Sequence, residues 1–87
     1  MKVEDWVIVL AENLKNELES NLSQSVIDSV AQQIEQANLT ASQKEFVWNY
    51  FSNQGYDKET GTFLVCFSDH SEFLKLVAMI KAKTEKK

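Results

Sequence analysis

Residues that interrupt helices are almost absent from this chain of 87 amino acids. It contains no proline, and its two glycines, Gly55 and Gly61, lie close together in the sequence. This composition excludes collagen-like sequence, flexible linkers and glycine-rich phosphate loops. Hydrophobic residues make up 44% of the chain, which is enough to build a folded core. We therefore expect a run of short regular elements, with Gly55 as the natural end of a helix.

The spacing of apolar residues predicts two helices in the first half of the chain. The first covers residues 3–20 and the second runs to about Ala37, where Asn38 closes it at a position that tolerates the left-handed conformation. Each has apolar side chains at the i, i+3, i+4 and i+7 positions of an amphipathic helix. These are Val3, Trp6, Val7, Leu10, Leu14 and Leu18 in the first helix, and Val26, Ile27, Val30, Ile34 and Ala37 in the second.

Capping residues mark two further helices. Thr40 and Gln43 have the spacing of a capping box, so a third helix is predicted to begin at Ala41. Asp69 and Glu72 offer an N-cap and a reciprocal acceptor for a last helix, from His70 to about Lys83. The predicted core faces are Phe46, Val47, Tyr50 and Phe51 in the third helix, and Phe73, Val77 and Ile80 in the last.

Residues 55–67 are predicted to form a β-hairpin. Residues 62–67 are a β-branched and aromatic run, and residues 57–61 supply turn chemistry before it. Residues 56–65 resemble the second hairpin of the immunoglobulin-binding domain of streptococcal protein G. The resemblance implies a turn geometry in which Tyr56 faces Phe63 across the strands. Because an isolated hairpin is only marginally stable, we expect the alternating side chains Phe63, Val65 and Phe67 to face the helices.

The predicted fold class is α+β, mainly α, with the element order α-α-α-β-β-α. We expect a single compact domain over residues 1–87, in which the Lys-rich residues 84–87 fray. Three helices followed by a hairpin and a helix resemble, in topology alone, a winged helix-turn-helix domain, since no sequence motif of that family is present.

The charge of the chain favours a protein partner over a nucleic acid. Thirteen acidic residues stand against nine basic ones, all of them lysine, and the net charge is −4. An acidic body without arginine repels phosphate and suits a partner with a basic surface. An unpaired cysteine and the absence of a membrane-spanning or signal-like stretch indicate a cytoplasmic protein.

Chemistry-bearing residues are too few to predict an enzyme, a metal site or a cofactor site. Cys66 and His70 lack a third group that orients the base, and Ser68, Asp69 and His70 are sequence neighbours whose side chains diverge at a helix start. The paired Cys or His spacings of zinc sites are also missing. We therefore expect no catalytic residues, no metal and no cofactor.

Apolar residues outside the predicted core faces indicate a partner or self-association surface. Trp48 is the strongest candidate because tryptophan is enriched at binding hot spots. Ile8, Val9, Leu74 and Met79 also lie off the core faces, although packing on a second helix face would equally explain Ile8, Val9 and Leu74. Spaced carboxylates are expected to meet the basic partner: Glu4, Asp5, Glu12, Glu19, Asp28 and Glu35.

Two functions remain open from the sequence. The first is a small intracellular protein that acts by binding another protein, as an inhibitor or adaptor of the bacterial or phage kind, such as an immunity, anti-restriction or anti-CRISPR protein. The alternative is a winged-helix DNA-binding regulator that could act as a homodimer. In that case Ala41 to Asn53 is the recognition helix. Its candidate DNA contacts are Lys44, Asn49, Asn53 and Gln54.

Overall fold

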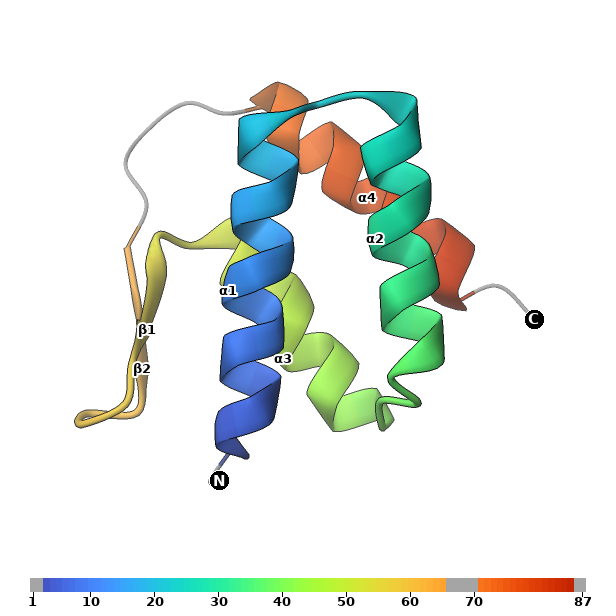
Figure 1. Cartoon of the computed structure of the whole chain (residues 1–87). Coiled ribbons are helices and arrows are strands. Elements are labelled where there is room, and N and C mark those ends of the chain that lie inside the picture. Colours follow the sequence, from blue (N-terminus) through green and yellow to red (C-terminus); the bar gives the residue numbers. More distant parts are fainter. Residues whose placement is uncertain (1–2, 66–70, 86–87) are drawn as a thin grey trace.

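Four helices and a two-stranded hairpin make up the part of the chain that the structure describes (Figure 1). A computed structural model describes residues 3–65 and 71–85. The predicted α+β class and its element order are confirmed. The elements are α1 (Asp5–Ser20), α2 (Gln24–Gln36), α3 (Ala41–Ser52), β1 (Gly55–Asp57), β2 (Thr62–Leu64) and α4 (Ser71–Glu85).

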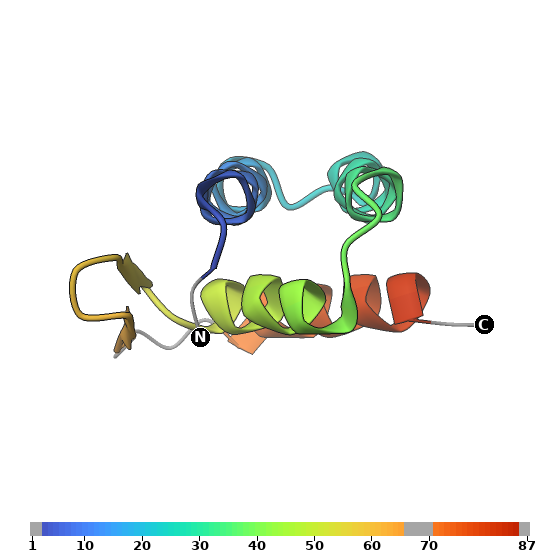
Figure 2. The ribbon, with the colours of Figure 1, turned by 90° about the horizontal axis from the view of Figure 1, so that it is seen from below.

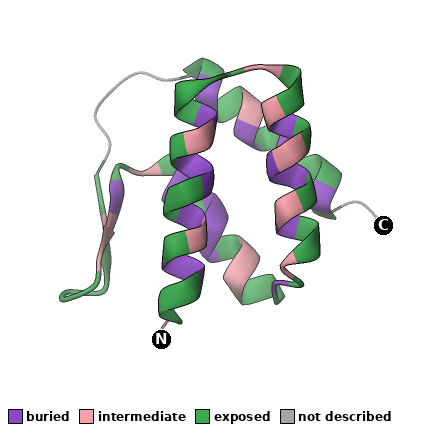
Figure 3. Cartoon of the chain, viewed as in Figure 1, coloured by how far each residue is buried: buried purple, intermediate pink, exposed green. Residues whose placement is uncertain are grey.

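The helices form two layers. α1 and α2 run in opposite directions in one layer, α3 and α4 form the other, and the hairpin stands beside α1 and α3 (Figure 2). α1 packs mainly on α3, and α2 mainly on α4. The buried residues face the space between the layers (Figure 3). Phe51, Leu14, Leu18, Ile34 and Ile80 are the largest side chains that lose essentially all contact with solvent.

Local capping explains where the helices begin. The Ser23 hydroxyl accepts a hydrogen bond from the Val26 amide at the start of α2. The predicted capping box of α3 is confirmed, because the Thr40 hydroxyl and the Gln43 side chain each bind the other's backbone amide. The predicted N-cap Asp69 and helix start His70 lie outside the described residues.

Some predicted helix ends are corrected. α1 begins at Asp5 rather than at Val3. α4 continues through Glu85, two residues beyond the predicted end at about Lys83. Two contacts hold this end of α4: Lys44 Nζ donates to the Thr84 carbonyl, and Trp48 Nε1 donates to the Glu85 carboxylate.

The hairpin has the predicted pairing but a shorter second strand. Tyr56 pairs with Phe63, as the resemblance to protein G implies. Both rings pack on Phe46, with centroids 5.0 and 5.2 Å from its own. The prediction that Val65 faces the helices is wrong, because β2 ends at Leu64 and Val65 is exposed. Phe67 lies outside the described residues.

Lys15 of α1 links two elements across the core. Its side chain is only 6% exposed. The ammonium group donates to the carbonyl of Tyr50, at 3.3 Å, and to the carbonyl of Asn53. These carbonyls lie at the C-terminal end of α3, where the helix dipole favours a positive charge. Lys15 thereby fixes the point from which the chain enters the hairpin.

Asn38 provides a test of the link between α2 and α3. Its φ of 52° lies in the left-handed region, as predicted for the residue that closes α2. Asn38→Val is expected to lower the free energy of unfolding by about 1–2 kcal/mol, because a β-branched side chain is strained there. Asn38→Gly, the matched control, should leave the stability unchanged or raise it slightly. Chemical denaturation measures both, and equal stabilities for the two variants would contradict this explanation.

Candidate protein-binding surface

The four apolar residues predicted to meet a partner divide into two groups. Trp48 and Ile8 are buried within the chain, with 5% and 8% of their surface exposed. The expectation that they lie outside the core is therefore wrong. Val9 and Met79 are about half exposed, as predicted, and so is Leu74 to a lesser degree. Val9 and Met79 belong to α1 and α4, in different layers of the fold.

Trp48 is buried because α3 has neighbours on three sides. α1 packs on the middle of its apolar face, the hairpin covers the Phe46 side, and α4 covers the Trp48 side. The Trp48 ring packs edge-on against Phe51, with centroids 5.9 Å apart. Its indole N–H reaches the Glu85 carboxylate at 3.2 Å. The apolar face of α3 is therefore about twice as wide as the apolar face of an ordinary amphipathic helix.

Periodicity predicted Trp6 on the core face of α1 and Ile8 outside it, whereas Ile8 is buried and Trp6 is exposed. Ile8 lines a cleft against Tyr56 of the hairpin, which covers that flank of α1. Trp6 was placed on the core face, but 49% of its surface is exposed. Its position on the helix is nearly opposite that of Ile8, more than 90° from the buried centre of α1. A helical wheel centred on Val7, Leu14 and Leu18 would have separated Trp6 from the core.

The predicted carboxylates lie on two separate flanks rather than on one surface. Asp5, Glu12 and Glu19 are seven residues apart, close to two full turns, and so line one flank of α1. The Tyr50 hydroxyl donates to Glu12 at 3.4 Å, which places this flank on the side of α3. Asp28 and Glu35, also seven residues apart, lie on a flank of α2 that faces α4, where Asp28 pairs with Lys83. Glu4 lies next to α1 and accepts from Gln43.

The ionisation of Tyr50 reflects the acidic flank beside it. Burial raises the pKa of the Tyr50 hydroxyl above its ordinary value of 10.0, and the charges of Glu12 and Glu19 raise it further. The charges of two carboxylates, about two turns apart on α1, therefore both disfavour loss of the Tyr50 proton. The neutral hydroxyl remains a hydrogen-bond donor to Glu12.

The solvent-exposed face of α1 combines these features, and we call it the α1 face. It is defined by Trp6 and Val9, one turn apart, and by the acidic flank Asp5, Glu12 and Glu19. Exposed tryptophan supplies a large apolar contact, and the carboxylates supply charge selection. The arrangement is suited to docking against a surface that has both an apolar pocket and basic side chains.

A cleft of about 470 Å³ opens between the start of α1 and the turn of the hairpin. Ile8 and Tyr56 contribute its apolar lining, and Asp5, Lys58 and Glu59 contribute charged groups. Lys58 Nζ lies 3.4 Å from Asp5 Oδ1 across it. The cleft adjoins the acidic flank of the α1 face, because Asp5 belongs to both.

The residues proposed for DNA contact are placed poorly for that role. Lys44 is engaged with the carbonyl of Thr84, and the backbone carbonyl of Asn53 accepts from Lys15. Asn49 and Gln54 are exposed. The solvent-exposed strip of α3 contains Glu45 beside Asn49 and no lysine. α1, α4 and the hairpin contact the other sides of this helix.

Within residues 3–65 and 71–85, no group of three or more His, Cys, Asp or Glu side chains is arranged to hold a metal ion. Cys66 and His70 lie outside these residues. None of the helices in the same part of the chain combines the length and the apolar character needed to cross a bilayer.

Comparison of the chain with protein-family models, with curated proteins and with solved structures gives no match.

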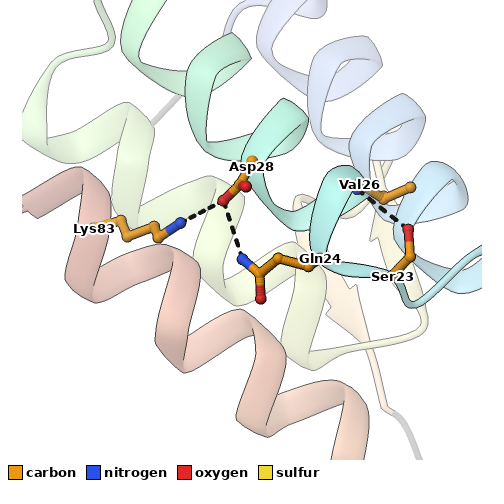
Figure 4. A network of polar contacts seen from close by, with 5 residues as sticks. All are labelled: Ser23, Gln24, Val26, Asp28 and Lys83. Atoms are coloured by element: carbon orange, nitrogen blue, oxygen red, sulfur yellow. Dashed lines mark hydrogen bonds and ion pairs between the residues drawn. The ribbon is translucent and has the colours of Figure 1, made fainter.

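The flank of α2 supplies a pH-dependent test (Figure 4). Hydrogen bonds from Lys83, and secondarily from Gln24, hold the pKa of Asp28 below its ordinary value of 3.8. The ionised carboxylate therefore stabilises the fold above pH 3.8, and this contribution is lost as the pH falls through the lower folded-state pKa. Asp28→Asn should lower the melting temperature at pH 7, by an amount that shrinks below pH 3.8 and in high salt.

Glu35→Gln is the matched control for that experiment. It removes a carboxylate from the same flank of α2, at a position that makes no ion pair among the described residues. Its melting temperature should stay within experimental error of the unsubstituted protein at every pH. A pH-independent effect of Asp28→Asn would show that the ion pair with Lys83 contributes nothing.

Proposed function

We propose that this chain acts by binding another protein through the α1 face. The observation that carries the proposal is Trp6, a tryptophan half exposed on a regular helix next to exposed Val9. Burying a side chain of this size contributes on the order of 1.5–3 kcal/mol to association. Tryptophan also loses little conformational entropy on binding, because only two χ angles are fixed. It is therefore suited to anchor a complex.

The acidic flank of the same face supports a partner with a basic surface. Asp5, Glu12 and Glu19 extend along α1 over about 21 Å, given a rise of 1.5 Å per residue. The one buried cation of this helix, Lys15, points into the core toward α3. A basic partner gains a faster encounter from such a field, and the gain falls as salt screens it. The apolar pair then determines how long the complex persists.

Within protein binding, we propose the role of inhibitor or adaptor that the sequence favours. Asp5 pairs with Lys58 of the hairpin turn, and Trp6, Val9, Glu12 and Glu19 are exposed on α1, whose outer side no other helix or strand covers (Figures 1 and 2). A partner can therefore approach along its whole length without unfolding the chain. Three aligned carboxylates would compete with phosphate groups for a basic partner surface that normally binds phosphate.

The test is capture of a partner from the source cell, followed by titration of the purified complex. Trp6→Ala should weaken binding at least 30-fold, because hot-spot truncations cost 2 kcal/mol or more. Its folding stability should change by no more than about 0.5 kcal/mol, as for an ordinary surface position. Glu12→Gln with Glu19→Gln should mainly slow association and flatten its salt dependence.

Trp48→Phe is the control for this experiment. It keeps an aromatic ring beside Phe51, and it removes the indole N–H bound to Glu85 together with part of the buried ring system. It should lower the melting temperature and leave the affinity for the partner unchanged. Undiminished capture by Trp6→Ala, or loss of capture by Trp48→Phe in a folded protein, would refute a role for the α1 face.

A further inference from the structure

The cleft between α1 and the hairpin turn is lined in part by the aromatic ring of Tyr56, which packs on two other aromatic rings. The Tyr56 ring packs edge-on against Phe46 at 5.0 Å and against Phe63 at 5.1 Å between centroids. A Cβ on Gly61 would lie 3.7 Å from the Tyr56 hydroxyl, so the ring extends beneath the turn. Ile8 of α1 also lines the cleft. Two ring contacts therefore hold Tyr56 in place where it lines the cleft.

Two carboxylates line this cleft, Asp5 and Glu59, and a third, Asp57, lies at the end of β1, where the turn begins. Asp57 is occupied by the turn itself, because its two oxygens accept from the Glu59 amide and the Thr60 hydroxyl. Asp5 and Glu59 border the cleft from opposite sides, one on α1 and one on the turn. A cation placed between them meets an aromatic face and negative charge together, which is the environment that favours guanidinium groups.

A cation of the chain itself already uses part of this environment. Lys58 Nζ lies 3.4 Å from Asp5 Oδ1, and both side chains are more than half exposed. An ion pair this exposed contributes little to stability, so exchange for an external cation is easy. Arginine has an advantage in that exchange, because its planar fork can pair with a carboxylate and stack on a ring at once.

We propose that this cleft binds one arginine side chain of a basic protein partner, with the guanidinium paired to Asp5 and lying over Tyr56 in place of Lys58. This rests on the proposed function, because it names the partner chemistry that the acidic flank of the α1 face would select. The cleft is a separate element of that surface, since Trp6 does not line it.

The probe is N-acetyl-arginine methylamide, titrated into the ¹⁵N-labelled protein and followed by amide chemical shifts. A ligand of this size is expected to bind with a Kd of about 1 mM. The amides of Ile8, Tyr56 and Gly61 should shift. N-acetyl-citrulline methylamide, which has nearly the same shape without the charge, should bind at least tenfold more weakly, because hydrogen bonds to ionised groups are the stronger ones.

Three variants locate the arginine site. Asp5→Asn should weaken arginine binding at least threefold, because it removes the paired charge. Lys58→Ala should strengthen it roughly 1.5- to 5-fold, the range that corresponds to releasing one exposed ion pair. Glu19→Gln, about 21 Å away along α1, should leave it unchanged. The spectrum of each variant also verifies that it is folded.

Several results would overturn the inference. They are equal binding of the arginine and citrulline probes, unchanged binding in Asp5→Asn, weaker binding in Lys58→Ala, and equal weakening by Asp5→Asn and Glu19→Gln. Equal weakening by Asp5→Asn and Glu19→Gln would mean that the arginine probe binds to all carboxylates of α1 alike and has no specific site. Failure here is distinct from failure of the proposed function, because partner capture is tested with Trp6→Ala and arginine binding with Asp5→Asn.

Discussion

The contact between Lys15 and the end of α3 is the constraint on which the rest of this structure depends. Its ammonium group is buried, and it donates to the carbonyl of Asn53 and, as a second donor beside the Asn53 amide, to the carbonyl of Tyr50. The charge also lies 5.8 Å from the centroid of the Tyr50 ring and 5.9 Å from that of Phe73. One side chain of α1 therefore contacts α3 and α4 together, and an unsatisfied carbonyl at this place would cost about 1–3 kcal/mol.

The position of the hairpin relative to α1 follows from this contact. Asn53 is the residue that ends α3, and β1 begins two residues later at Gly55. Phe46 then holds the hairpin from the side of α3 through the rings of Tyr56 and Phe63. The turn comes to lie against the start of α1, where Lys58 meets Asp5. The position of the cleft beside α1 is therefore a consequence of how α3 ends.

Local features of the fold could be predicted from the sequence, whereas the burial of Trp48 could not. The capping box of Thr40 and Gln43 and the left-handed Asn38 depend on neighbouring residues alone, and both are confirmed. The burial of Trp48 depends on α4 packing on a second side of α3, which periodicity within one helix does not encode. Lys15 is a polar residue on a buried flank, and only the position of α3 explains it. The carboxylates predicted to meet a partner divide into two flanks, and this division depends on how α2 packs on α4.

The most direct test of this account is amide hydrogen exchange in Lys15→Met, which keeps most of the stem and removes the charge. Relative to α2, the amides of Asn53 and Gln54 should exchange about tenfold faster, because the α3 carbonyls lose their donor; tenfold corresponds to about 1.4 kcal/mol. In the unsubstituted protein these amides bind the carbonyls of Tyr50 and Leu64. Unchanged exchange of Asn53 and Gln54 relative to α2 would contradict the claim that Lys15 positions the hairpin.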